Sequence, residues 1–167
     1  FEVTPAPVVR ARAEYEESFA NTFLSESARA LNLPVPRLPS DSGYLAFQAA
    51  DSLTLRGTVL SPSVSGGRGS AIDISTPRDI VINATGKSAG AGVVTLSAPV
   101  LNSFGAESLV IGGRRVRGED GTTLVVRTGN ITVDNAGTVL SAPDLVLAAN
   151  NNLVIAGGAR IASGGML

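Results

Sequence analysis

Apolar and polar residues alternate in short runs over most of the chain, from Tyr44 to the C-terminus. Alternation with a period of two is the pattern of a β-strand with one buried face. The runs come in pairs separated by a polar turn, and the second members of these pairs resemble one another. They are DSLTLRG (51–57), RDIVINA (78–84), ESLVIGG (107–113), GNITVDN (129–135) and NNLVIAG (151–157). A strand repeat of about 20–30 residues predicts a solenoid, in which each unit buries its apolar side against the next.

The first members of the pairs are equally short. They are LAF (45–47), AIDI (71–74), VVTL (93–96), TLVV (123–126) and DLVL (144–147). A third apolar position often follows the second strand, so the pattern predicts an all-β parallel β-helix of about five triangular coils over residues 43–167. Inward residues of successive coils should then form one aliphatic column. Its members would be Leu55, Ile82, Ile111, Val133 and Ile155. The insertion APVLNSFGA (98–106) interrupts the spacing and is expected to bulge or form a loop.

A short polar residue precedes each second strand. These residues are Ser52, Asp79, Ser108, Asn130 and Asn152. Each can bond to neighbouring backbone groups and so satisfy a turn. Stacked at one corner, they would form a hydrogen-bonded ladder; alternatively, each simply serves its own turn. Neither interpretation implies chemistry.

The first 42 residues have a different pattern. Residues 8–31 contain no Gly or Pro, and Tyr15, Phe19 and Phe23 recur at helical spacing, which predicts one amphipathic helix followed by a Pro-rich connector. In the repeats, the outward positions include apolar residues where a solvated face would carry charge. Three of them are Val81, Val110 and Val154. We expect the aromatic stripe of the helix, or a neighbouring polypeptide, to cover this column.

The composition excludes several kinds of functional site. The formal charge of −1 gives no basic footprint for nucleic acid, and the absence of Cys and His removes thiol nucleophiles, disulfides and the commonest metal ligands. No cofactor or metal is expected. No apolar run approaches the ~18–20 residues of a membrane-spanning helix.

The repeat text resembles the filamentous haemagglutinin-like exoproteins of Gram-negative bacteria. The resemblance rests on ESLVIGG, on NITVDNAGTVLSAPDLVLAANNNLVIAGGARI and on GGRGSAIDISTPRDIVINA, and it covers about residues 43–167. It implies a right-handed parallel β-helix, an adhesive or toxin-delivery role, and export to the cell surface through an outer-membrane transporter of the two-partner type. The Asn-Pro-Asn-Gly motif of the family's secretion domain does not occur, so the resemblance implies an internal stretch of the filament.

The most charged stretch of the repeats is GGRRVRGEDG (112–121). Arg114, Arg115 and Arg117 are candidate contacts for an acidic or sulfated glycan, or for a surface receptor. The alternative is a solvated corner loop balanced by its own acids.

Three functions follow from this pattern. The first is a non-enzymatic, adhesive shaft of a secreted protein. The second is a carbohydrate-active enzyme using paired carboxylates, but Asp73 and Asp134 lie on different coils and do not converge. The third is a filament subunit that self-associates end to end through unpaired strand edges.

Overall fold

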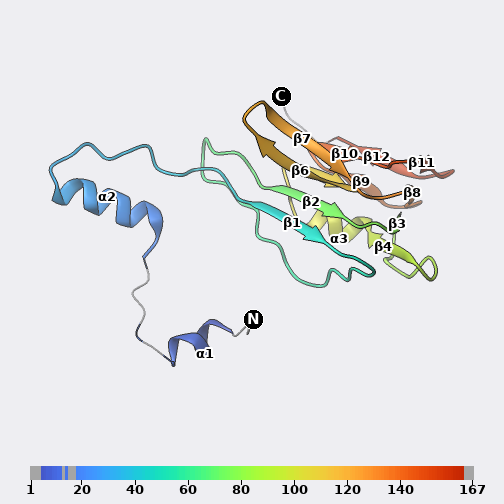
Figure 1. The fold of residues 1–167 in the computed structure, drawn as a ribbon, viewed down its shortest axis with the longest axis horizontal. Helices are drawn as coiled ribbons and strands as arrows, with labels where there is room; N and C mark the ends of the chain where they lie inside the picture. Colours follow the sequence, from blue (N-terminus) through green and yellow to red (C-terminus); the bar gives the residue numbers. More distant parts are fainter. Residues whose placement is uncertain (1–4, 13, 15–17, 164–167) are drawn as a thin grey trace. The chain divides into compact units, whose positions relative to one another are not determined.

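A computed structural model describes residues 5–12, 14 and 18–163 (Figure 1). Contacts divide the chain into two units, Phe1–Pro39 and Ser40–Leu167. The first unit contains two short helices, α1 (Ala6–Arg10) and α2 (Ala20–Ala30).

The single helix predicted over residues 8–31 is wrong. Phe19 has an extended backbone, with ψ of 134°, directly before α2, so no continuous helix passes through it. Of the predicted aromatic stripe, Tyr15 lies outside the described residues, Phe19 precedes the helix, and Phe23 lies on it with its side chain exposed. The proposed packing of this stripe on the strands stays a prediction.

The second unit contains two four-stranded parallel sheets. Sheet A runs, in spatial order, β1 (Tyr44–Gln48), β2 (Ala71–Ser75), β5 (Ser108–Ile111) and β10 (Asp144–Leu147). Sheet B runs β11 (Asn152–Ile155), β8 (Asn130–Asp134), β3 (Asp79–Asn83) and β4 (Val93–Ser97). A third sheet pairs β9 (Val139–Ser141) with β12 (Arg160–Ala162), also in parallel. The remaining elements are the helix α3 (Ala98–Ser103) and an antiparallel hairpin, β6 (Gly113–Gly118) and β7 (Gly121–Val126).

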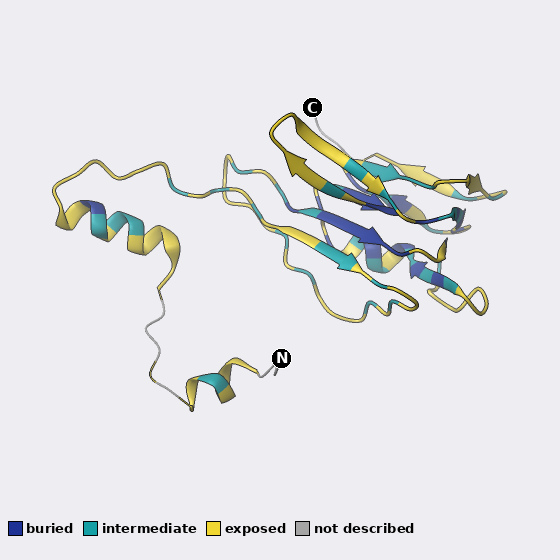
Figure 2. Ribbon diagram, viewed as in Figure 1, coloured by how far each residue is buried: buried dark blue, intermediate teal, exposed yellow. Residues whose placement is uncertain are grey.

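Alternate residues of both large sheets point into one core. Ile72 and Ile74 of β2 are fully buried, as are Ile80 and Ile82 of β3, whereas Val81 between the latter two is half-buried (Figure 2). Leu101 and Phe104, in and after α3, belong to the same core. The period of two in the sequence therefore marks the buried faces correctly.

The chain visits the three sheets in a fixed order in its C-terminal part. After β5 in sheet A come β8 in sheet B and β9 in the third sheet, and the same order repeats with β10, β11 and β12. Each strand pairs in parallel with its counterpart of the preceding winding. The predicted parallel pairing is confirmed for these sheets.

The predicted single column is wrong in its membership. Ile82, Val133 and Ile155 are register partners in sheet B, but Ile111 pairs with Ile74 and Leu147 in sheet A. Leu55 lies outside the strands. The reason is that similar local sequences occupy different sheets: ESLVIGG forms β5 in sheet A, whereas RDIVINA forms β3 in sheet B.

The β4 strand departs from the regular winding. After β3 the chain returns through residues 84–92, where Gly86, Gly90 and Gly92 have positive φ angles, and places β4 on the side of β3 away from β8. Glycine adopts these angles without the steric cost that other residues incur.

The predicted loop at residues 98–106 contains α3 instead. Its Asn102 side chain donates to the carbonyl oxygen of Val139 (2.7 Å) and accepts from the amide of Ser141 (2.9 Å). The amide group of Asn102 therefore pairs with the edge of β9 as a neighbouring strand would. The helix covers one edge of the third sheet by this means.

Three of the five predicted corner residues form a ladder. The side-chain nitrogen of Asn152 donates to Oδ1 of Asn130, and the side-chain nitrogen of Asn130 donates to both carboxylate oxygens of Asp79, each at 3.0 Å. Ser108 lies in sheet A and bonds to Asp144 instead.

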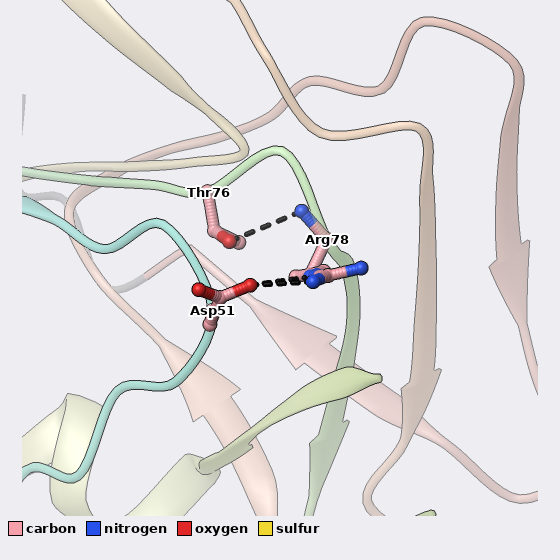
Figure 3. Close-up of polar contacts among 3 residues, drawn as sticks. All are labelled: Asp51, Thr76 and Arg78. Atoms are coloured by element: carbon pink, nitrogen blue, oxygen red, sulfur yellow. Dashed lines mark hydrogen bonds and ion pairs between the residues drawn. The ribbon is translucent and has the colours of Figure 1, made fainter. Parts of the chain in front are cut away.

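An exposed ion pair fixes a second contact between windings. Arg78, which precedes β3, pairs with Asp51 in the segment after β1, and its amide donates to Oγ1 of Thr76 (3.1 Å; Figure 3). Because both charged side chains are largely exposed, the pair contributes at most about 1 kcal/mol.

Candidate functional site

The β6–β7 hairpin is an insertion at one corner of the winding. At Gly112 the chain leaves sheet A with φ of +97°, and a Cβ atom there would overlap the carbonyl oxygen of Ala148. The same residue accepts hydrogen bonds from the amides of Arg127 (3.0 Å) and Thr128 (3.1 Å), so both ends of the hairpin meet at Gly112. Thr128 then continues the corner by donating its hydroxyl to the carbonyl of Thr76 (2.8 Å). The winding continues past the hairpin without interruption.

The hairpin covers the outward face of sheet A. Val110, which was predicted to lie in an outward column covered by a helix or a partner, is only 2% exposed. Its register neighbour Asp73 is 1% exposed and contacts Arg115 of β6. The prediction for Val110 is therefore corrected: the chain covers this residue with its own hairpin. Figure 1 shows β6 and β7 beside the strands of sheet A.

Asp73 is the centre of a polar cluster beneath the hairpin. Its Oδ2 accepts from the backbone amide of Arg115 (2.6 Å) and from the hydroxyl of Tyr44 (2.7 Å). Its Oδ1 lies 3.2 Å from Nε of Arg115 in an ion pair. A buried carboxylate needs such partners because isolated charge is costly to remove from water.

Burial, the hydrogen bond to Asp73 and the negative charge of Asp73 together raise the pKa of the Tyr44 hydroxyl to about 12, against smaller opposing effects of Arg114 and Arg115. Tyr44 is therefore a hydrogen-bond donor, not a phenolate, at neutral pH.

A cleft of about 750 Å³ opens beside this cluster. Its lining includes the first residue of every strand of sheet A, together with residues of the hairpin. The sheet residues are Tyr44, Ala71, Ser108 and Asp144, and the hairpin residues are Arg115, Arg117 and Thr122. Parallel strands begin at a common edge, which explains why residues far apart in sequence meet here.

The other acids of the cleft lining have protein donors. Asp41 accepts from the amide of Arg68 (2.9 Å), Glu107 accepts from the amide of Gly69, and Asp144 accepts from the hydroxyl of Ser108. Each of these carboxylates thus helps to hold a strand end or a loop in place.

The arginine side chains of the cleft differ from these acids in their hydrogen bonding. Within the described part of the chain, the side chains of Arg68 and Arg117 make no hydrogen bond or ion pair, although both residues line the cleft. The Nη2 atom of Arg115 is buried without a hydrogen-bond partner. The cleft therefore presents two exposed guanidinium groups without protein acceptors, whereas its carboxylates are already hydrogen-bonded to the protein.

The structure separates the three arginines of the predicted contact. Arg115 and Arg117 share one face of β6 and line the cleft, whereas Arg114, which directly precedes Arg115, lies on the other face of the strand and outside the cleft lining. The predicted corner loop is wrong, since residues 113–126 form the hairpin. Val81 and Val154 lie on the outward face of sheet B. Val81 is half-buried, and Val154 is 49% exposed.

Sequence reasoning missed Tyr44 and Arg68. The hairpin begins at Gly113, more than forty residues after both of them. No local spacing in the sequence therefore indicates that they lie close to it. The hairpin itself had a signal, because Gly118–Gly121 lies between two alternating runs.

Within residues 5–12, 14 and 18–163, no group of three or more His, Cys, Asp or Glu side chains is arranged to hold a metal ion. Among the same residues, no helix has the length and apolar character needed to cross a membrane. Comparisons with protein-family models, with curated proteins and with solved structures gave no match to this chain.

Proposed function

We propose that this chain is a structural and adhesive segment of a secreted or cell-surface bacterial exoprotein, in which a right-handed parallel β-helix acts as a rigid shaft. The observation that carries this proposal is the repeated order of sheets from β5 to β12, with parallel register between windings. Right-handed winding is the strong preference for parallel strands joined by crossovers. Stacked windings of this kind suit a rigid, non-catalytic spacer, because contacts with its neighbours stabilise every winding.

Export through an outer-membrane transporter of the two-partner type is part of the same proposal. It is supported by the resemblance of the repeat text, in particular NITVDNAGTVLSAPDLVLAANNNLVIAGGARI, to filamentous haemagglutinin-like exoproteins. The receptor surface we assign to the adhesive role is the cleft and hairpin, where charge departs from the regular apolar strands.

An enzymatic role has less support. The most buried acid, Asp73, is engaged by Tyr44 and Arg115, and Asp134 is exposed at the end of β8 in the other large sheet. A glycosidase needs two carboxylates about 5–10 Å apart across one sugar.

Beads coated with the chain test the proposal against this alternative. They should adhere to films of polygalacturonate or heparin, or to cultured epithelial cells, while the size distribution of each polysaccharide stays unchanged. Shortened polysaccharide would contradict the non-enzymatic role, and absence of adhesion to all of these surfaces would contradict the adhesive role.

End-to-end self-association is a second candidate, favoured by the strands of the last winding. β10, β11 and β12 are each edge strands, and the inward side chains of Leu153, Ile155 and Ile161 are partly exposed near a cavity of about 460 Å³. Unpaired edges beside an open apolar interior favour the addition of strands. Sedimentation velocity should detect polymers that Ile155→Lys disperses; a monomer at all concentrations would reject this candidate.

A further inference from the structure

The charges of the cleft are unequally satisfied, and this difference points to a ligand. Asp41, Glu107 and Asp144 accept hydrogen bonds from the protein itself, whereas the side chains of Arg68 and Arg117 have no partner within the described residues. Arg115 adds a buried nitrogen without a hydrogen bond. Exposed guanidinium groups that no protein acceptor engages are available to the oxygen atoms of an anionic ligand.

We propose that this cleft binds an acidic saccharide, whose carboxylate or sulfate group is held by Arg115, Arg117 and Arg68. Guanidinium groups suit such oxyanions because their planar donors match two oxygen atoms at once. Arg115 lines the cleft, and its ion pair with Asp73 holds its guanidinium group in place. The inference deepens the adhesive part of the proposed function and rests on it.

Tyr44 supplies the second element of a saccharide site. Its hydroxyl is committed to Asp73, which fixes the ring, while the residue remains 47% exposed and lines the cleft. An aromatic side chain with an apolar face and a fixed polar end is suited to pack against the carbon–hydrogen face of a sugar ring. Phe104, by contrast, is buried in the core and cannot serve this role.

The size of the cleft and the exposed guanidinium groups of its lining favour this class over others. A volume of about 750 Å³ falls within the range of about 300–1,000 Å³ that is usual for small-molecule sites, and it suits a short oligosaccharide. A metal cation is disfavoured, because the described acids do not form a ligating cluster. A neutral sugar would leave the guanidinium groups unpaired.

Isothermal titration calorimetry of the full chain with three probes tests this proposal. The probes are tetragalacturonate, a heparin tetrasaccharide and neutral galactotetraose. We expect at least one acidic probe to bind ten times more tightly than the neutral one. Whether tetragalacturonate or the heparin fragment binds tells which oxyanion fits, and either result supports the proposal. Equal affinity for the neutral probe would overturn it.

Two variants and a matched control locate the contact. Arg117→Ala and Arg68→Ala should each weaken binding of the acidic probe by about tenfold, which is the scale of one charge-assisted hydrogen bond. Both side chains are exposed and make no hydrogen bond or ion pair within the described residues, so circular dichroism should show an unchanged fold. Arg114→Ala removes the same charge from the same strand outside the cleft and should weaken binding by less than twofold. Equal losses in Arg114→Ala and Arg117→Ala would indicate non-specific attraction and overturn the site.

Bead adhesion separates this inference from the function on which it rests. Coated beads that adhere equally with wild-type chain and with the Arg68→Ala/Arg117→Ala double variant would overturn the cleft as the site while leaving the adhesive role intact. Loss of adhesion in the double variant, with Arg114→Ala still adherent, supports both.

Discussion

The two large sheets have the same inward architecture but different outward faces. Both send aliphatic side chains into one core, and both pair in parallel over four strands. The outward face of sheet A lies under the hairpin and contains a fully buried carboxylate, whereas the outward face of sheet B presents Thr132 and Val154 at its surface. The difference shows that the winding determines the core, while an insertion at one corner determines where charge and a cleft appear.

The largest expected effect concerns the buried carboxylate of sheet A. Asp73→Ala should lower the free energy of unfolding by about 3 kcal/mol, because it leaves Arg115 without its buried partner and Tyr44 without its acceptor. Thr132→Ala, on the open face of sheet B, should cost about 0.5 kcal/mol. Urea denaturation measures both. Equal costs would mean that the hairpin does not cover sheet A.

A smaller effect is expected when the same substitution is made on the outward face of each large sheet. Val110→Ala should destabilise the fold by about 2 kcal/mol, because the side chain is 2% exposed and its loss leaves a cavity. Val154→Ala should cost about 0.5 kcal/mol, since that residue is 49% exposed. The comparison fails if the cost at Val154 matches the cost at Val110.

The corner ladder of sheet B should contribute less. Asn130→Ala removes the bonds to Asp79 and Asn152 and should cost about 1 kcal/mol, the usual net value for exposed hydrogen bonds of this kind. Asn130→Asp should be worse than Asn130→Ala, because it places a second carboxylate against Asp79. Thermal unfolding of both variants checks the order, and a more stable aspartate variant would contradict the ladder.

The smallest expected effect concerns the ionisation of Tyr44 on the covered face of sheet A. The pKa of Tyr44 is raised from 10.0 to about 12, so the stabilisation from its protonated hydroxyl is complete below pH 10 and is lost as the pH rises through 12. Ultraviolet titration should therefore show one tyrosine ionising near pH 12, and Tyr44→Phe should abolish that component. A single transition near pH 10 for both tyrosines would contradict the hydrogen bond to Asp73.

Sequence alternation predicts which side chains are buried but not which sheet receives them. Ile80 and Ile82 follow the period of two and are buried as expected. ESLVIGG and RDIVINA look alike, yet β5 and β3 belong to opposite sheets. Local pattern encodes the buried face of a strand, whereas its place in the winding depends on connection lengths and on inserted elements such as α3.

The cleft was predictable only in part. Arg115 and Arg117 stand out as charged residues in an apolar repeat, and the alternation of strand faces separates them from Arg114. Tyr44 and Arg68 join them through tertiary structure alone, because the parallel strands bring their amino ends to one edge.

Successive windings pair in parallel, and the hairpin is inserted at Gly112. Scalar couplings across hydrogen bonds, measured by nuclear magnetic resonance on the labelled chain, test both features of the fold. We predict couplings from the amide of Gly112 to the carbonyl of Ile74 and from the amide of Ala148 to the carbonyl of Ile111, whose donor–acceptor distances are 2.8 and 2.9 Å. Couplings that join residues 108–111 to residues 130–134 would place Ile111 in sheet B and contradict the account.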